Sequence, residues 1–212
     1  MSRPRLLDLF CGAGGCAVGY HRAGFDVVGV DVKPQPRFPF EFIQADAFDY
    51  LEALMGLSRF GTDIPFAAIH ASPPCQAYSR ATAWRGDRDK HPDLIAQTRE
   101  GLSWFGVPYA IENVQEARHL LRGGFMLCGS SFGLPFRRHR WFELSVPVGE
   151  LVSPCQHRKG DYSFDHGVKQ AEAVYRDAME CDWMTVHESR QAIPPAYTEF
   201  IGRQLLNAIN HQ

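Results

Sequence analysis

The sequence predicts one α/β domain built on a mainly parallel, doubly wound sheet of the Rossmann-like type. The first observation behind this fold is a glycine-rich turn at residues 12–15, which joins an apolar strand at 6–10 to a helical stretch at 16–23 and a second strand at 27–30. The second is that polar or reactive residues directly follow several further apolar strands. The third is the length, because 212 residues are enough for one such domain with a sizeable core.

The first strand, turn, helix and second strand form a nucleotide-binding βαβ unit. Glycines in the turn let the backbone approach a ligand closely. Asp31 ends the second strand 19 residues after Gly12 (31 − 12 = 19), which suits a carboxylate that accepts hydrogen bonds from ribose hydroxyls. Gly12, Gly14 and Ala17 also satisfy the dinucleotide fingerprint, so these residues leave NAD open as the cofactor. A tight turn with close helix packing is the structural alternative.

Cys75 follows an apolar run at residues 64–71, which reads as a buried strand. Pro73 and Pro74 stop this strand and hold the backbone extended, so they set the direction of the sulfur. A cysteine in a loop at the carboxyl end of a strand is a candidate nucleophile if a nearby positive charge or helix N-terminus lowers the pKa of its thiol. The alternative is a buried structural cysteine after a proline turn.

Acidic residues follow two further strands. Asp46 comes after a strand at 40–44, where its carboxylate can reach an adenine amine or cap the helix at 47–55, and the two roles are compatible. Glu112 comes after a strand at 107–111, which follows a helix at 92–105. In a parallel sheet these acids lie at the same edge as Asp31 and Cys75, which indicates a functional site.

Two basic stretches are candidates for contact with nucleic-acid phosphates, and a solvated surface is the alternative for both. One covers residues 80–90, and the other holds Arg137, Arg138 and Arg140 between strands at 125–128 and 141–146. Residues 151–167 are predicted to form a loop, 168–179 a weak helix, 187–192 a further helix, and 198–209 a final helix with one apolar face.

The composition is that of an ordinary globular protein, with a net charge of −2, so any nucleic-acid contact must come from local basic stretches. No apolar run is long enough to span a bilayer and no signal peptide is seen, so we expect a cytoplasmic protein without membrane contact. The six cysteines have no framework spacing and indicate free thiols. Cys155 and His157, even with His166 and Cys181, lack a standard zinc spacing, so we expect no metal.

In this order, the motifs resemble those of the cytosine-5 DNA methyltransferases. The four stretches that carry the resemblance are Asp8-Leu9-Phe10-Cys11-Gly12-Ala13-Gly14-Gly15, Pro73-Pro74-Cys75-Gln76, Glu112-Asn113-Val114 and Arg138-His139-Arg140. The resemblance covers residues 5–145 and, more weakly, 183–209. It implies a class I S-adenosylmethionine-dependent methyltransferase fold, with residues 1–212 as a single catalytic domain.

The resemblance implies methyl transfer from S-adenosylmethionine to carbon 5 of cytosine in DNA, with Cys75 bonded covalently to carbon 6. Glu112 would hydrogen-bond ring nitrogen 3, Arg140 the carbonyl oxygen of the base, and Arg138 would support Glu112 or the loop. The implied cofactor-binding residues are Asp8, Phe10, Cys11, Gly12, Ala13, Gly14, Gly15, Asp31, Val32, Asp46, Ala47 and Pro74. The cytosine must be flipped out of a duplex or already single-stranded.

The chain departs from the family pattern in its last third. Phe136 stands where the family usually has glutamine, and the Gly-Asn-x-Val-Pro signature is absent near the last helix. Only 42 residues, Trp141 to Asp182 (182 − 141 + 1 = 42), replace the target recognition domain, with 147–185 as a reduced insert. We therefore expect a compact, phage-type, monomeric enzyme with a short or relaxed DNA preference. The alternatives are a nucleic-acid-binding protein without turnover, and methylation of RNA or a free cytosine nucleotide.

Overall fold

A computed structural model describes residues 2–78, 92–150, 152–157, 162–163 and 176–211. The basic stretch at 80–90 lies outside the described residues. So does most of the helix predicted at 168–179, of which residues 176–178 are described and helical. Within the described part of the chain, no helix combines the length and apolar character that a membrane span requires.

The core of the molecule is one seven-stranded sheet with the order β3-β2-β1-β4-β5-β8-β6. Its strands are β1 (Arg5–Leu9), β2 (Asp26–Asp31), β3 (Glu41–Gln44), β4 (Ala68–Ala71), β5 (Tyr109–Val114), β6 (Phe125–Leu127) and β8 (Arg140–Leu144). Strands β1 to β5 pair in parallel, and β8 is antiparallel to both β5 and β6. The predicted mainly parallel sheet is therefore confirmed.

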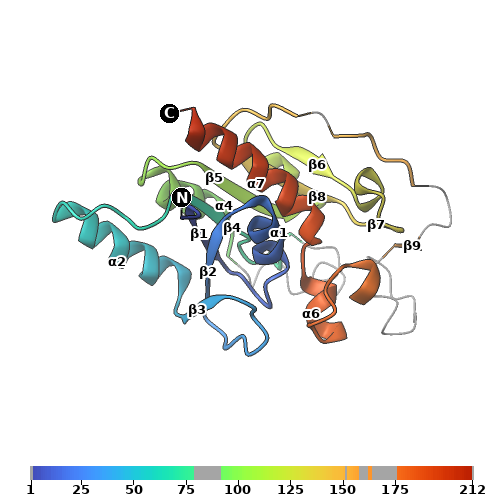
Figure 1. Cartoon of the computed structure of the whole chain (residues 1–212), viewed down its shortest axis with the longest axis horizontal. Helices are drawn as coiled ribbons and strands as arrows, with labels where there is room; N and C mark the ends of the chain where they lie inside the picture. Colours follow the sequence, from blue (N-terminus) through green and yellow to red (C-terminus); the bar gives the residue numbers. More distant parts are fainter. Residues whose placement is uncertain (1, 79–91, 151, 158–161, 164–175, 212) are drawn as a thin grey trace.

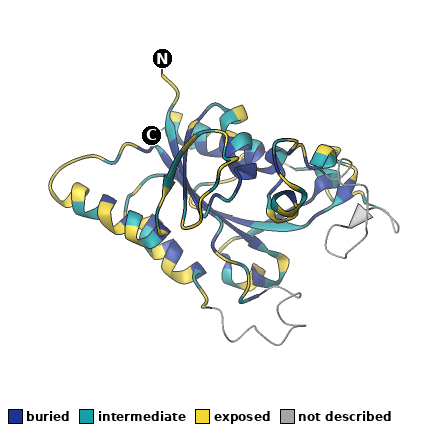
Figure 2. Ribbon diagram, turned by 90° about the horizontal axis from the view of Figure 1, so that it is seen from below, coloured by how far each residue is buried: buried dark blue, intermediate teal, exposed yellow. Residues whose placement is uncertain are grey.

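Helices cover both faces of this sheet (Figure 1), as a doubly wound fold requires. One apolar layer joins α1 (Gly15–Ala23) and α7 (Pro195–Asn210) to the strands. The opposite layer joins α2 (Ala47–Arg59) and α4 (Ile95–Ser103) to them. Figure 2 shows the buried strands between helices whose outer sides are exposed. The remaining described helices are α6 (Val186–Gln191) and the short 3-10 helices η2 (Gln115–Leu120) and η3 (Gly129–Phe132).

Four strands, β4, β5, β7 and β9, differ from the sequence prediction. Strand β4 covers only the last four residues of the run at 64–71. Strand β5 continues through Glu112 to Val114, because residues 110–114 pair with the antiparallel strand β8. A second sheet joins β7 (Phe136–Arg137) to β9 (Tyr162–Ser163), although Tyr162 and Ser163 were predicted to be loop. Two-residue strands have too few positions to show an alternating pattern, so only their pairing reveals them.

The α1–α7 contact allows no side chain at Gly19. A Cβ atom there would lie 2.1 Å from both the Pro195 carbonyl oxygen and Thr198 Oγ1. The Thr198 hydroxyl donates a buried hydrogen bond of 2.9 Å to the Cys16 carbonyl oxygen, so it cannot move aside freely. The two helices thus pack backbone against backbone, and this contact holds the helix that follows the glycine-rich turn.

Replacing Gly19 by alanine will therefore destabilise the fold by at least about 2 kcal/mol, because the added methyl group overpacks a rigid contact. Urea unfolding of the variant and the parent protein measures the difference. Gly56→Ala is the matched control, since Gly56 lies in helix α2 and a Cβ there has nothing within 4 Å. That control should gain about 0.5–1 kcal/mol from the better helix propensity. Equal stability of the two variants would contradict the packing argument.

Candidate active site

The register of the sheet brings the predicted residues to one edge. Leu9 pairs with both Val30 and Ala71, so β1, β2 and β4 end at the same level. Asp31 pairs with Gln44, which places the end of β3 beside them. Ala71 pairs with Ile111, so Glu112 is level with the start of the loop that carries Cys75. Ligands of open α/β sheets bind outside this edge.

The turn between β1 and α1 is a strained loop with an open side. Phe10, Gly12 and Gly14 all have positive φ angles, of 59°, 51° and 91°. For Phe10 such a conformation costs energy and is typical of functional loops. A Cβ at Gly14 would lie 2.7 Å from Pro39 Cδ, whereas one at Gly12 would have no atom within 4 Å. The loop is therefore packed on one side and accessible at Gly12.

The acids beside this loop fit the nucleoside part of S-adenosylmethionine. Asp31 accepts backbone hydrogen bonds from Gly12 (3.0 Å) and Lys33 (2.9 Å), one on each oxygen, and each oxygen keeps a lone pair for a ribose hydroxyl. Val32 is 60% exposed and offers an apolar surface next to it. Asp46 caps α2 through one oxygen, which accepts from the N–H groups of residues 48 and 49. Its other oxygen accepts no bond from the described residues, so the two predicted roles are compatible.

Asp8 lies beneath the loop and has no accessible surface. Among the described residues its two carboxylate oxygens have no hydrogen-bond partner. Burial, reinforced by the charge of Asp31, raises the pKa of Asp8 well above its usual value. Burial therefore favours the protonated form of this carboxyl, which supports the loop from below without the exposed surface that direct contact with a cofactor requires. Cys11, Ala13 and Ala47 are also buried.

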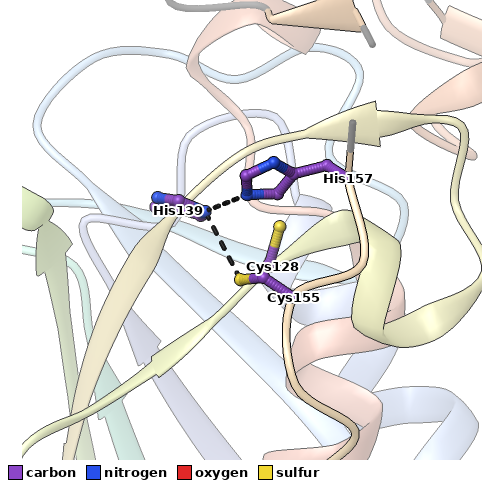
Figure 3. Close-up of side chains that lie close together, drawn as sticks. All are labelled: Cys128, His139, Cys155 and His157. Atoms are coloured by element: carbon purple, nitrogen blue, oxygen red, sulfur yellow. Dashed lines mark hydrogen bonds between the residues drawn. The ribbon is translucent and has the colours of Figure 1, made fainter. Parts of the chain in front are cut away.

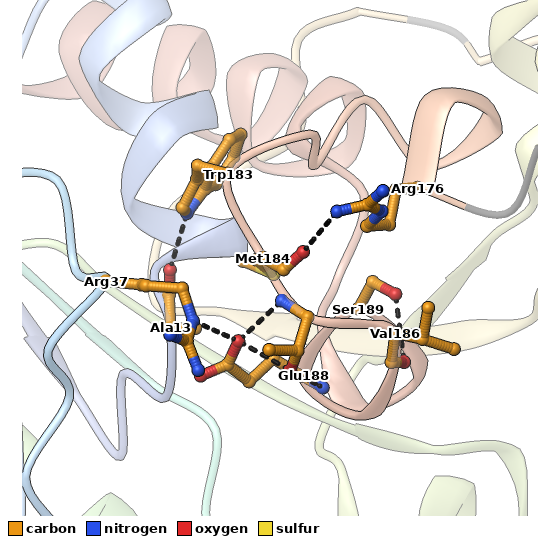
Figure 4. Close-up of polar contacts among 9 residues, drawn as sticks. Ala13, Arg37, Arg176, Trp183, Met184, Val186, Glu188 and Ser189 are labelled. Atoms are coloured by element: carbon orange, nitrogen blue, oxygen red, sulfur yellow. Dashed lines mark hydrogen bonds and ion pairs between the residues drawn. The ribbon is translucent and has the colours of Figure 1, made fainter. Parts of the chain in front are cut away.

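Residues 183–188, near the C-terminal end of the chain, contact the glycine-rich turn and the connection after β2 (Figure 4). Trp183 Nε1 donates a hydrogen bond of 2.9 Å to the Ala13 carbonyl oxygen. Arg37, from the proline-rich connection after β2, forms an ion pair of 2.8 Å with Glu188. Glu188 also completes a capping box with Thr185 at the start of α6. These contacts tie together three segments that are far apart in the sequence.

The Cys75 loop is anchored by a residue that the sequence argument left without a role. Asn113 Nδ2 donates a buried hydrogen bond of 3.0 Å to the Pro73 carbonyl oxygen, and its Oδ1 accepts from the N–H of Val114 (2.9 Å). Asn113 thus links β5 to the prolines before Cys75. Cys75 itself is half-buried, and Pro74 is exposed. An amide side chain, which donates and accepts at once, suits this bridging position.

Glu112 and Arg140 form a buried ion pair next to Cys75. Arg140 Nε lies 3.2 Å from Glu112 Oε1. Burial raises the pKa of Glu112, and the charges of Arg140 and Arg138 and a hydrogen bond with Ser72 offset this only in part. Burial also raises the pKa of the Cys75 thiol, which Arg140 lowers and Glu112 raises. The same guanidinium therefore acts on both candidate catalytic groups.

A buried polar chain behind Glu112 was missed from the sequence. The Tyr20 hydroxyl and His70 Nδ1 are 2.8 Å apart, and His70 Nε2 lies 2.9 Å from Ser72 Oγ. Burial lowers the pKa of His70 to about 3, so the ring is neutral. The chain positions the Ser72 hydroxyl, which lowers the pKa of Glu112. A histidine inside the apolar strand at 64–71 was the available sequence signal.

Arg138 supports the loop. Its side chain is 2% exposed, and Nη2 donates a hydrogen bond of 3.0 Å to the Arg190 carbonyl oxygen. The Tyr197 hydroxyl donates to the Arg138 carbonyl oxygen (2.6 Å), so this residue connects the start of β8 to α6 and α7. Its charge also helps to lower the pKa of Glu112.

A parallel sheet with antiparallel β8, a glycine loop after β1 and an acid at the end of β2 define the Rossmann-like methyltransferase class. A solved methyltransferase from Entamoeba histolytica, EhMeth, shares this fold with a TM-score of 0.51 and 15% identity, over 84% of this chain and 67% of that one. The chain belongs to the C-5 cytosine-specific DNA methylase family, whose model matches residues 4–120.

Two further proteins whose names say that they are methyltransferases are similar to this chain. The Type II methyltransferase M.XorII of Xanthomonas oryzae pv. oryzae is 26% identical over 216 aligned residues, which cover 96% of this chain and 45% of that protein. The chain thus spans about half the length of this curated relative. The S. pombe Dnmt2 methyltransferase structure is 22% identical, with a TM-score of 0.42, over 77% of this chain and 54% of that one.

Proposed function

We propose that the protein transfers a methyl group from S-adenosylmethionine to carbon 5 of cytosine in DNA. The observation that carries the proposal is the cluster of Cys75, Glu112 and Arg140 at the carboxyl edge of the sheet. In this cluster one guanidinium acts on both a thiol and a buried carboxyl group. Asp46, Cys75 and Glu112 have no joint role in hydride transfer to or from NAD, so the glycine loop is assigned to S-adenosylmethionine.

Cys75 supplies the nucleophile. Its thiolate forms a bond to carbon 6 of the base, and the electron pair of the 5,6 double bond becomes available at carbon 5. The bound cofactor supplies an electrophilic methyl group on a sulfonium sulfur. After transfer, carbon 5 loses its proton to solvent water, and the electron pair of that C–H bond re-forms the double bond while Cys75 leaves carbon 6 with the electron pair of the S–C bond. The thiolate is then returned unchanged.

Glu112 and the arginines favour this addition. A protonated Glu112 donates to ring nitrogen 3 of the base, which makes carbon 6 more electrophilic, and its raised pKa favours the required acid form. Arg140 contacts Glu112 and also holds the carbonyl oxygen of the cytosine. Arg138 and Asn113 are positioning residues, since the first holds the loop before β8 and the second holds the Cys75 loop.

In this proposal, residues at the ends of β1, β2 and β3 would hold the cofactor. Gly12 leaves room for its close approach, Asp31 holds the ribose hydroxyls, and Asp46 faces the adenine. The remaining residues of the proposed binding set are Phe10, Cys11, Ala13, Gly14, Gly15, Val32, Ala47 and Pro74, while the buried Asp8 supports the loop from below without contacting the cofactor.

The DNA preference of this single domain is expected to be short or relaxed. Only 42 residues, Trp141 to Asp182 (182 − 141 + 1 = 42), stand where a recognition domain would read base edges. The enzyme would act as a monomer on a flipped-out or single-stranded cytosine. Phosphate contacts dominate such binding, so its affinity should fall steeply with salt concentration.

Transfer of a tritiated methyl group to duplex DNA, single-stranded DNA, transfer RNA and dCMP, measured side by side, tests the proposal. We expect label in DNA, and bisulfite sequencing should place it at carbon 5 of cytosines in many sequence contexts. Label confined to RNA or dCMP would refute the DNA substrate, and methylation at one long site would refute the relaxed preference. A binding protein without turnover would label nothing and would form no adduct with 5-fluorocytosine DNA.

A further inference from the structure

Two cysteines and two histidines meet beside the active site (Figure 3). Cys128 directly follows β6, His139 directly precedes β8, and Cys155 and His157 lie on the segment 152–157. In the sequence, Cys155 and His157 do not form a standard zinc spacing with His166 and Cys181. His166 lies outside the described residues, and the Cys181 thiol donates instead to the Met179 carbonyl oxygen (3.2 Å). In the folded chain, Cys155 and His157 lie next to Cys128 and His139.

The four potential ligand atoms lie close enough together to surround one metal ion. All of them lie within 4.8 Å of one another. The Nε2 atoms of His139 and His157 are 3.2 Å apart, and Cys155 Sγ is 3.5 Å from His139 Nε2. Bonds of about 2.0 Å to nitrogen and 2.3 Å to sulfur imply tetrahedral edges of about 3.3 Å between nitrogens and about 3.5 Å between nitrogen and sulfur. Both measured edges match.

Surrounding groups orient the ligands. His139 Nδ1 lies 3.0 Å from Gln115 Oε1, and by donating its proton there the ring turns the lone pair of Nε2 toward the cluster. Ser130 Oγ lies 3.3 Å from Cys128 Sγ and accepts a hydrogen bond from the N–H of Gln156.

We propose that Cys128, His139, Cys155 and His157 bind one structural Zn²⁺ ion. Two thiolates and two imidazoles form a Cys₂His₂ set, and four protein ligands leave no open position for water or substrate. The ion would fasten segment 152–157 to the ends of β6 and β8. Because His139 lies between Arg138 and Arg140, it would also hold the turn that presents the active-site arginine. A small metal clamp would thus stabilise the reduced region that replaces a recognition domain, and this inference does not depend on the proposed methyl transfer.

Metal analysis of the whole chain, purified without chelators and under reducing conditions, tests the proposal. We expect about one zinc ion per chain, in keeping with one tetrahedral site. After removal of zinc, added Co²⁺ should give the visible d–d bands of tetrahedral cobalt and the charge-transfer absorption of thiolate ligands. A chain that carries no zinc and gives no cobalt spectrum would overturn the proposal. So would mass-spectrometric detection of a Cys128–Cys155 disulfide as the state of the fully folded protein.

Variants locate the site. Cys155→Ser and His157→Gln should each lose most of the bound zinc and weaken the cobalt charge-transfer band. The matched controls are Cys75→Ser, a half-buried cysteine outside the cluster, and His119→Gln, an exposed histidine on η2. Both controls should keep the zinc of the parent protein. Equal zinc in the Cys155 variant and the controls would overturn the assignment, and the cobalt spectrum of the unaltered chain remains decisive if a variant fails to fold.

Discussion

Replacing Cys75 by serine is expected to abolish methyl transfer, with a fall in kcat on the order of 10⁴-fold or more, as for other lost nucleophiles. A serine hydroxyl ionises far less readily than a thiol, so it cannot provide the anion that adds to carbon 6. The loop itself should keep its shape, because Asn113 holds the carbonyl oxygen of Pro73 and not the cysteine side chain. Binding of S-adenosylhomocysteine should therefore be unchanged.

Three measurements separate loss of chemistry from loss of structure in this variant. Tritium transfer gives kcat, calorimetry with S-adenosylhomocysteine gives cofactor affinity, and 5-fluorocytosine DNA traps the covalent adduct. Cys181→Ser is the control, because its hydroxyl can replace the thiol as donor to the Met179 carbonyl oxygen. A Cys75→Ser protein that still forms the covalent adduct would show that another residue is the nucleophile.

Replacing Glu112 by glutamine should lower kcat/KM by about 10²–10⁴-fold, the usual contribution of a positioned acid. Glutamine has nearly the same shape and can occupy the buried position beside Arg140, but it cannot deliver a proton to ring nitrogen 3. Glu100→Gln is the control, because Glu100 is exposed on α4 and its replacement should leave kcat/KM unchanged.

The pH dependence gives a sharper test of Glu112. Activity needs protonated Glu112 and ionised Cys75. In this active form the two groups together hold one proton, which lies on Glu112. Burial raises the pKa of both groups, so activity should be level between the two raised values. At pH values below the Glu112 pKa, activity should decrease because the pair holds two protons. At pH values above the Cys75 pKa, activity should decrease because the pair holds none.

Glu112→Gln should change the shape of this profile as well as its height. The variant needs only the Cys75 thiolate, so its activity should rise with pH and then stay level. Its rise should be centred at a lower pH than the parent's alkaline fall, because the Glu112 charge that raises the Cys75 pKa is gone. A steady-state pH series on both proteins provides the comparison, and an alkaline fall that persists in the variant would rule out Glu112 as the proton donor.

The sequence by itself determined the parallel half of the fold and the edge at which the site lies. Gly12 and Asp31 stand on either side of one helix, so their spacing is a local property, and the structure joins them by a hydrogen bond of 3.0 Å. Cys75 likewise follows its strand directly, and its place at the carboxyl edge follows once the strands are parallel. Patterns of this kind are readable because a strand or helix repeats its periodicity over neighbouring residues.

Only the tertiary structure decided which distant residues meet. Glu112 lies inside β5 because β8 pairs back against that strand, and no local signal announces an antiparallel partner that begins at residue 140. Cys128 and Cys155 are 27 positions apart (155 − 128 = 27), with β8 between them, and they join His139 and His157 only when the segment 152–157 returns to the end of β6. Such contacts depend on the path of the chain through space, which the spacing of residues in the sequence does not specify.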